Sequence, residues 1–394
     1  MVVATGEPVY RRIREEIAPH FEELARCRSA AEMEAHPAYR LIAPAVRAVL
    51  ETVETGGYRT AAAPARERYR IVAWNIERGT ELEGQLEVFR AHPYVRHFDV
   101  LLLTELDIGM ARSGNRDVVR ELARELGLDY AFVPCYLNLT KGSGMERAVE
   151  GENELGLHGN AILSRYPIAN ARRIPLANGI DKVASREKRL GSQTAVAAEL
   201  EFPNGRLTVA SVHLDAQSSQ RHRRDQMRQV LDALPGSGPV VLGGDWNTTT
   251  YDSSRAAWAI LGFWLRVLMG VDHVIRNHYL HPYHRFEREL FELLETRGFD
   301  WRRANQLGEH TIGYEFHNNK TRHSLGEWVP AWCFPFIRWS LRNHGGRCPF
   351  KLDWLATRGV RPENPVVVHD VREGREAPLS DHDAIGVEVA FPHP

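Results

Sequence analysis

The chain has 394 residues, of which 43% are hydrophobic and 26% charged, and its formal net charge at pH 7 is −1. This composition is typical of a globular protein and argues against the strongly basic domain that usually marks a nucleic-acid-binding protein. Four scattered cysteines argue against a zinc ribbon or a dense disulfide framework. No apolar run reaches the roughly 18 residues of a membrane span, and no secretory signal is visible, so we expect a cytoplasmic protein.

The first part of the chain has a helical pattern. Apolar residues recur at steps of three and four along it, at Val9, Ile13, Ile17, Phe21 and Leu24. Gly56 and Gly57 end the pattern, a second helix is expected at about 38–53, and an alanine-rich linker follows. We therefore predict an N-terminal helical extension and linker over residues 1–66 and a larger domain over residues 67–394.

From Tyr69 onward, short apolar runs separated by turns predict strands. These runs are 70–75, 100–105, 130–135, 159–164, 193–202, 207–213, 240–244, 352–357 and 385–391. Helices are expected between several of them, at 82–91, 114–127, 217–234 and 286–297. Numerous strands with intervening helices predict an α/β (α+β) protein in which two packed sheets are flanked by helices.

Residues 251–350 form a long, aromatic-rich insertion between two strand candidates. Its most apolar part, Ala256–Val271, is interrupted only by Arg266. Such a run is typical of a buried helix, and the alternative is a helix lying on a membrane surface. A second set of aromatic residues covers the first or lines a substrate cleft: Trp328, Trp332, Phe334, Phe336 and Trp339.

Polar side chains stand at the ends of six apolar runs, where a single acid is usually only a cap or turn residue. They are Asn75 and Glu77, Glu105, His213 and Asp215, Asp245 and Asn247, Asp353, and Asp381 and His382. Because strand residues two apart point to the same face, Asp245 and Asn247 are aimed together. Amide and carboxylate oxygens suit Mg²⁺ or Mn²⁺ better than zinc. With histidines that exchange protons near neutral pH, these residues predict hydrolysis of a phosphate ester.

Seven motifs in this order resemble the signature of the endonuclease/exonuclease/phosphatase superfamily, which includes deoxyribonucleases and neutral sphingomyelinases. The motifs are Asn75, Glu105, HGNAILSRYPI at 158–168, SVHL at 211–214, GDWN at 244–247, LDW at 352–354 and SDH at 380–382. The resemblance covers about residues 69–392. It implies a four-layered α/β sandwich, with two packed mixed β-sheets flanked by helices and the active site at one edge of the sheets.

The resemblance also implies roles for particular residues. Glu105 is the expected principal metal ligand, with Asn75 and Asp381 close to an Mg²⁺ or Mn²⁺ ion, or possibly to Ca²⁺. Glu77 is either a further metal ligand or a residue that contacts the metal ligands without binding the ion itself. Two residues are expected at the substrate entrance, Asn160 and His158.

The resemblance implies catalytic roles for a second group of residues, Asp245, His382, His213, Asp353 and Asn247. Asp245 orients or deprotonates the attacking water, and Asn247 contacts the scissile phosphate. His382 pairs with Asp353 and acts on the phosphate, while His213 stabilises the transition state. Whether Asp245 or His382 is the base stays open.

The substrate is not determined by the family. A general phosphodiesterase is our first expectation, and a lipid-directed enzyme that touches a membrane surface through residues 256–271 is the second. A nuclease that contacts phosphates through Arg221–Arg228 is the third, and a catalytically silent binding module on the same fold is the last. The sequence indicates no oligomeric state.

Overall fold

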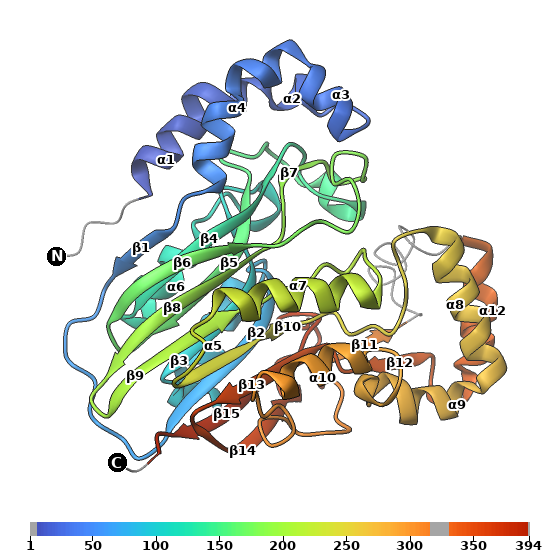
Figure 1. Ribbon diagram of the computed structural model, residues 1–394. Helices are drawn as coiled ribbons and strands as arrows, with labels where there is room; N and C mark the ends of the chain where they lie inside the picture. The colour runs from blue at the N-terminus through green and yellow to red at the C-terminus, as the bar shows by residue number, and fades with distance from the viewer. Residues whose placement is uncertain (1–5, 316–330, 393–394) are drawn as a thin grey trace.

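The computed structural model describes residues 6–315 and 331–392, and two β-sheets packed face to face form its centre (Figure 1). In spatial order, the strands of the larger sheet are β1 (Glu54–Gly57), β4 (Asp129–Asn138), β5 (Leu157–Ser164), β3 (Val100–Ile108), β2 (Tyr69–Arg78), β15 (Ala384–Ala390) and β14 (Arg361–Val368), with β7 (Arg189–Gly191) paired to β4. Those of the smaller sheet are β13 (Asp353–Arg358), β10 (Val240–Asp245), β9 (Gly205–Ser211), β8 (Thr194–Phe202) and β6 (Ile168–Pro175). Strands β2 and β3 are parallel, as are β9 and β10, while their other neighbours are antiparallel. Both sheets are therefore mixed, as predicted.

The central strands are apolar on both faces because each face is covered. Along β2, Ile71 and Ala73 pack between the two sheets, whereas Val72 and Trp74 pack under the outer helices. This alternation follows from the two-residue period of a strand. A strand buried on both sides has a nearly continuous apolar sequence, which is why these runs were visible without a structure.

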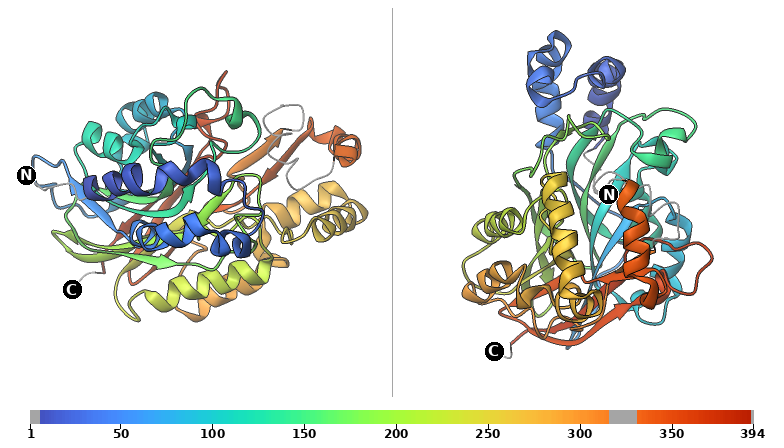
Figure 2. Two further views of the ribbon diagram at one scale, coloured as in Figure 1. Left: turned by 90° about the horizontal axis from the view of Figure 1, so that it is seen from above. Right: turned by 90° about the vertical axis from the view of Figure 1, so that its right-hand side faces the viewer.

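Helices cover the outer face of each sheet and complete four layers (Figure 2). The larger sheet is covered by α4 (Pro37–Leu50), α5 (Leu82–Ala91) and α6 (Val118–Leu126), and the smaller sheet by α7 (Gln220–Ala233) and α10 (Arg288–Thr296). Helix α5 has the bounds that the sequence predicted, and α6, α7 and α10 are a few residues shorter. The predicted four-layered α/β sandwich is confirmed.

The N-terminal extension shares the core of the larger sheet. It contains α1 (Glu7–Arg12), α2 (Phe21–Leu24), α3 (Ala30–Ala35) and α4. The helical path is interrupted by a short 3₁₀ turn at Ala18–His20, where Pro19 cannot donate a backbone hydrogen bond. Strand β1 then pairs with β4, Glu54 lying opposite Phe132. The domain boundary near residue 66 stays a prediction. Strand β1 comes from the predicted extension, yet it is part of the larger sheet.

Strands β1, β6 and β14 were not predicted, and each lies at an edge of its sheet. Most residues of β6 are at least partly exposed, so it lacks a clear apolar pattern. Strand β14 contains Pro362 and Pro365, which are tolerated only where no partner strand needs their backbone donor. Edge strands carry weaker sequence signals because they pack against fewer neighbours.

The insertion forms a separate lobe beside the sheet edge (Figure 1). Its elements are α8 (Ala256–Met269), α9 (Val271–Val274), β11 (Ile312–Glu315), α12 (Phe334–Ser340) and β12 (Arg347–Phe350). Strands β11 and β12 pair with each other, and α8 and α12 project side by side from the lobe (Figure 2). Trp328 lies outside the described residues.

The expectation that Ala256–Val271 is a buried helix is wrong. Arg266 is the only residue of α8 that is fully buried. Trp258, Leu261, Leu265 and Leu268 are each at least 45% exposed. Among the described residues, no single helix is long and apolar enough to cross a membrane. Ala256–Met269 and Val271–Tyr279 meet these criteria only together, and they bend by 107°.

Candidate active site

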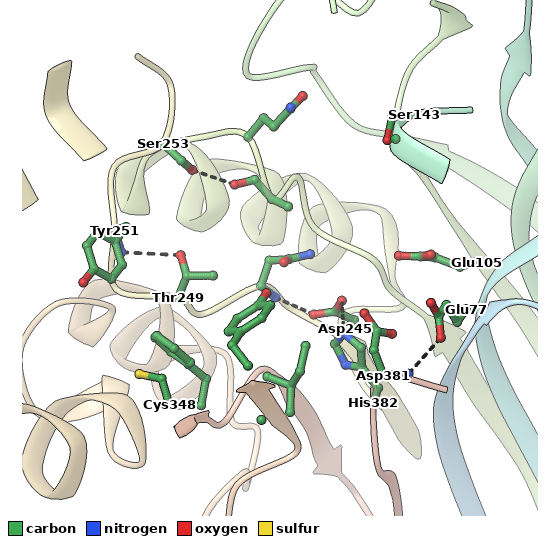
Figure 3. A pocket seen from close by; sticks show the side chains of 18 of the residues that line it. Glu77, Glu105, Ser143, Asp245, Thr249, Tyr251, Ser253, Cys348, Asp381 and His382 are labelled. Atoms are coloured by element: carbon green, nitrogen blue, oxygen red, sulfur yellow. Dashed lines mark hydrogen bonds and ion pairs between the residues drawn. The ribbon is translucent and has the colours of Figure 1, made fainter. Parts of the chain in front are cut away.

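The predicted polar residues meet at one edge of the paired sheets, where all of them except the buried Asn75 and Asp353 line a cavity of about 760 Å³ (Figure 3). Strands β2, β3 and β10 reach this edge with their carboxyl ends, while β13 and β15 begin there. Polar side chains from five strands or the loops beside them therefore converge on one space. Figure 3 shows Asp245, Asp381 and His382 close together, with Glu77 and Glu105 beyond them.

Asn75 joins the two main carboxylates of the site. Its Nδ2 lies 3.0 Å from Glu105 Oε1 and 3.3 Å from Asp245 Oδ2. Its Oδ1 accepts a hydrogen bond from the backbone N–H of Glu77 at 3.1 Å. The buried amide therefore sets the separation between a carboxylate of the larger sheet and one of the smaller sheet.

Glu105 is presented to the cavity by an irregular strand. Its φ is +56°, a left-handed conformation that non-glycine residues seldom adopt, and the pairing of β3 with β5 shifts register between Leu103 and Leu106. A bulge of this kind turns one side chain away from the regular alternation. The strained backbone at Glu105 is thus what turns its carboxylate toward the cavity.

Ionisation of Glu105 is favoured by its neighbours. Burial raises its pKa, but the Arg78 guanidinium and the His213 and His158 imidazoles lower that pKa well below its usual range. Arg78 Nε lies 3.9 Å from Glu105 Oε2. Glu105 is therefore a carboxylate at neutral pH and is available to a cation.

Asp353 and Asp245 are paired across the smaller sheet. They lie opposite each other in the antiparallel register of β10 and β13. Asp353 Oδ2 is 2.7 Å from His382 Nδ1, and His382 Nε2 is 3.7 Å from Asp245 Oδ2. The imidazole thus stands between two buried carboxylates, with one nitrogen held and the other facing Asp245.

The backbone of His382 is held in place as well. Its carbonyl accepts a 2.9 Å hydrogen bond from Trp74 Nε1, and its N–H donates to Ser380 Oγ at 3.1 Å. Ser380 in turn donates to the carbonyl of Asn75 at 2.6 Å. These bonds fix the SDH segment to the end of β2.

The two carboxylates favour the protonated form of the His382 imidazole. Burial lowers the pKa of His382, but Asp353 and Asp245 raise it well above its ordinary value. Burial raises the pKa of Asp245, His382 lowers it and Asp353 raises it, so that the net pKa is also raised. The two carboxylates favour the charged form of the His382 imidazole, and this imidazole is the cation that lies nearest to both of them.

His213 lies at the same end of the cavity as Glu105, Asp245 and His382, which we call the catalytic end. Its Nε2 lies 3.5 Å from Asp245 Oδ2 and 3.9 Å from Glu105 Oε1. Burial lowers the pKa of His213 to about 4, against the attraction of Glu105. It is therefore a neutral hydrogen-bonding group, in contrast to His382.

The residues present fit a divalent cation. Ligand atoms of Glu105, His213 and Asp245 all lie within 4.8 Å of one another, and so do those of Asp245, Asp353 and His382. Carboxylate oxygens dominate both groups, and they are the ligands that hard cations prefer. Asp381 lines the same cavity, and its backbone N–H donates to Glu77 Oε2 at 3.1 Å, but its carboxylate belongs to neither group.

Asn247 also faces the cavity. Its backbone N–H donates to Asp245 Oδ1 at 2.9 Å, and its Nδ2 donates to the carbonyl of Leu214 at 2.9 Å. Its φ of +49° turns the chain sharply after β10. Asp245 and Asn247 both line the cavity as expected, but it is this turn rather than the strand alternation that places Asn247 there.

The two residues predicted at the substrate entrance lie in different places. His158 lines the cavity, with Nδ1 2.8 Å from Asp107 Oδ1. Asn160 lies beneath Glu105 instead, and it is 1% exposed. Its Nδ2 donates to the carbonyl of Thr194 at 2.8 Å, while its Oδ1 accepts from the N–H of Glu105 at 3.4 Å. Asn160 thus supports the strained backbone of Glu105.

One wall of the cavity was not predicted. Arg112 makes a two-pronged contact with Asp107, at 2.7 and 3.0 Å, and it also contacts Glu187 at 2.6 Å. Asp107 follows Glu105 by two residues on β3, and this spacing was the one available signal. Arg78 ends β2, Arg112 lies in the turn after β3, and Glu187 precedes β7, so no sequence pattern joins them.

The fold and this site together define a hydrolase of phosphate esters. The model of the Endonuclease/Exonuclease/phosphatase family matches residues 72–382, which is most of the chain. The protein therefore belongs to this family of divalent-metal-dependent phosphodiesterases, nucleases and phosphatases. A comparison with curated proteins found no match.

Several solved structures are similar to this chain at low sequence identity. An endonuclease/exonuclease/phosphatase from Beutenbergia cavernae is 16% identical, with 83% of this chain and 72% of that chain covered and a TM-score of 0.50. The human Nocturnin catalytic domain with bound sulfate is 16% identical over 86% of this chain and 98% of that chain, with a TM-score of 0.47. A 3'-5' exonuclease from Neisseria meningitidis is 14% identical over 82% and 100%, with a TM-score of 0.46.

Proposed function

We propose that the protein is a phosphodiesterase in which a water molecule attacks phosphorus in line with the leaving oxygen. The observation that carries this proposal is the convergence of Asn75, Glu105, His213, Asp245 and His382 on one end of the cavity. A fixed position for water opposite the leaving group lowers the entropic part of the barrier. Preorganised donors around the phosphate stabilise the charge that develops in the transition state.

Each residue has a role that follows from its contacts. Asp245 orients the attacking water, and His382, held by Asp353, exchanges the proton or donates to a phosphate oxygen. Neutral His213 donates a hydrogen bond to another phosphate oxygen, and the Asn247 amide contacts the scissile phosphate. Whether Asp245 or His382 is the base is left open by the 3.7 Å separation of Asp245 Oδ2 from His382 Nε2.

Glu105 and Asn75 are the proposed holders of an Mg²⁺ or Mn²⁺ ion, with Ca²⁺ as a possible substitute and Asp381 at the open side. The lowered pKa of Glu105 supports this role, because the ionised form binds cations. A bound divalent ion supplies neutralisation of charge on the phosphate and leaving oxygens.

A lipid phosphodiester is the second candidate substrate, favoured by the shape of the cavity. From the catalytic end the cavity continues to an apolar end lined by Ile260, Phe263 and Val267 of α8 and by Ile337 and Leu341 beside it. A substrate with a phosphate ester and an apolar tail would match both ends. We also propose a cytoplasmic location, where Mg²⁺ is available.

A nucleic-acid substrate is less favoured. Three of the four arginines of α7 face acids of the same protein, and two of these, Arg223 and Arg224, pair with Glu287 and Glu289. Arg228 pairs with Asp225 at 2.9 Å. Because three of the four arginines are already paired, the helix offers little free charge to a phosphate backbone. A nuclease would lose affinity for nucleic acid steeply as salt rises, and we expect hydrolysis of a soluble phosphodiester by this protein to be nearly independent of salt.

The direct test is release of nitrophenol from bis-(p-nitrophenyl) phosphate, with and without EDTA. We expect activity that EDTA abolishes and that Mg²⁺ or Mn²⁺ restores. Glu105→Gln should require at least about tenfold more metal for half-maximal activity, whereas Glu15→Gln, a matched change on an exposed helix surface, should not. No turnover with Mg²⁺, Mn²⁺ or Ca²⁺ would favour a silent binding module.

A further inference from the structure

Helix α8 has the reverse of the usual polarity of a surface helix. Its single charged residue points inward, because Arg266 is 4% exposed and donates to Thr250 Oγ1 at 3.1 Å and to the carbonyl of Gly262 at 2.9 Å. The guanidinium also lies 4.0 Å from the ring centre of Tyr251 and 4.2 Å from that of Phe286. A surface helix normally turns its charges toward water.

The outward face of α8 is an apolar stripe. Trp258, Leu261, Leu265 and Leu268 are spaced three or four residues apart, so they share one side of the helix. Their exposed fractions are 50%, 58%, 45% and 84%. Residues that line the cavity, such as Ile260 and Phe263, are on the other side. Helix α8 is therefore apolar toward both the cavity and the surroundings.

A second exposed apolar stripe lies beside the first. Trp332, Phe336 and Trp339 are 55%, 47% and 60% exposed, and they too are spaced by four and three residues. Phe336 contacts Trp264 of α8, their ring centres being 5.6 Å apart. Figure 2 shows α8 and α12 next to each other on the projecting lobe. We call these two stripes the apolar face.

The two segments that carry the apolar face contain mostly positive charges. Residues 255–276 and 332–347 contain Asp272 as their single acid and six arginines: Arg255, Arg266, Arg276, Arg338, Arg342 and Arg347. Apart from the buried Arg266, these arginines are exposed. Tryptophan and leucine beside arginine are the composition of a helix that lies in the interface of an anionic membrane. A face that bound only another protein would not require this charge bias.

The geometry points to docking of the apolar face, in the plane of the interface, on an anionic lipid bilayer. Helix α8 has 14 residues and is about 21 Å long, shorter than the roughly 30 Å hydrocarbon core. The chain turns by 107° between α8 and the segment that follows. Both features fit a helix that lies on a bilayer. Trp258, Trp332 and Trp339 then sit at the level of the lipid headgroups.

Docking also gives the apolar end of the cavity a function. Because the cavity runs from the catalytic residues to the inner faces of α8 and α12, a docked enzyme has an apolar surface between its active site and the bilayer. The substrate is then a phosphodiester carried by a lipid. This second statement rests on the proposed function, whereas docking itself does not.

Flotation with vesicles, carried out in EDTA to prevent turnover, tests docking without catalysis. We expect the full chain to float with phosphatidylcholine vesicles that contain phosphatidylglycerol, and to bind pure phosphatidylcholine more weakly. Leu261→Asp/Leu268→Asp should weaken binding at least about tenfold, because two exposed leucines lose their burial in the bilayer. Leu41→Asp is the matched control, since Leu41 is 74% exposed on α4, and it should bind like the wild type.

A second double variant tests how much the arginines contribute to binding of anionic vesicles. Arg338→Gln/Arg342→Gln should lower affinity for phosphatidylglycerol vesicles about fivefold per arginine and leave binding to phosphatidylcholine unchanged. Docking is overturned if the wild type does not float, or if Leu41→Asp loses as much binding as Leu261→Asp/Leu268→Asp. A concentration-dependent dimer that this double variant abolishes, without vesicle binding, would instead assign the apolar face to a second copy of the chain.

Turnover separates the docking proposal from the proposed function. Leu261→Asp/Leu268→Asp should hydrolyse bis-(p-nitrophenyl) phosphate like the wild type, since neither residue lines the cavity. It should lose at least about tenfold in hydrolysis of a phosphodiester presented in vesicles. If the wild type floats but hydrolyses neither substrate, the proposed function fails and docking stands. If it hydrolyses the soluble diester and does not float, docking alone fails.

Discussion

The two ends of the cavity differ in how they are built. At the catalytic end, polar side chains hold one another, as in the 3.0 Å contact of Asn75 with Glu105 and the 2.7 Å contact of Asp353 with His382. At the α8 and α12 end, the inner surface is apolar and belongs to a hydrophobic cluster separate from the cluster between the sheets. The sheets therefore fix the chemistry, while the lobe determines what reaches it.

The largest expected effect is at the catalytic end. Asp245→Ala and His382→Ala should each lower turnover of bis-(p-nitrophenyl) phosphate at least about a hundredfold, the lower end for loss of an acid–base group. Steady-state kinetics on the purified variants, with thermal unfolding to verify folding, measures this. Flotation with vesicles should not change, because neither residue belongs to the apolar face. Near-normal turnover in His382→Ala would remove that residue from the mechanism.

An intermediate effect is expected where the two ends are joined, at Arg266. Arg266→Ala leaves the Thr250 hydroxyl and carbonyl without their charged donor and removes the contacts with Tyr251 and Phe286. We expect the free energy of unfolding, measured in urea, to fall by about 2 kcal/mol. Arg255→Ala changes the exposed arginine at the start of the same helix and should change that free energy by less than about 0.5 kcal/mol. Equal losses in both variants would contradict an anchoring role for Arg266.

The smallest effect is expected far from both ends, at Asp117. Burial and the Glu54 carboxylate raise the pKa of Asp117 to about 6. The folded state then binds this proton more tightly than the unfolded state. The contribution of Asp117 to the free energy of unfolding is therefore greatest at low pH, and it falls as pH rises from about 4 to about 6. Asp117→Asn keeps the cap of α6 without the charge, and we expect it to be more stable at pH 7 by about 2 kcal/mol or less.

Urea unfolding at several pH values measures this effect. The difference between wild type and Asp117→Asn should be near zero below pH 4, grow up to pH 6 and stay constant above it. A difference that does not vary with pH would show that Asp117 is not the titrating group. Vesicle binding and turnover at pH 7 should be the same in both proteins, which makes this variant a control for the two ends of the cavity.

Much of the fold was predictable because its central strands are buried on both faces. Runs such as Val240–Leu242 are apolar without interruption, and polar residues follow them directly, so the strand and its functional end are both visible in the sequence. The strand period places Asp245, whereas Asn247 faces the same cavity because of the left-handed turn that follows the strand. The edge strands were not predicted, because one side of each faces solvent and its apolar pattern is weaker.

The contacts between segments far apart in the chain were not predictable from local pattern. Asp353 lies opposite Asp245 because β13 pairs with β10 in one particular register, although more than a hundred residues separate them along the chain. The bulge that aims Glu105 depends on β5, and the charged wall of Arg112, Asp107 and Glu187 depends on loop positions. These features come from pairing partners that no local pattern specifies.

The sequence by itself determined the strands, the polar residues at their ends and the kind of chemistry that such residues perform, because side-chain type and strand period are local properties. Only the tertiary structure decided which residues touch and which apolar residues stay outside. Apolarity sets the free energy of leaving water, but it does not say whether the new surroundings are the protein's own core or another apolar phase. Helix α8 demonstrates the difference, with its one charge inside and its leucines outside.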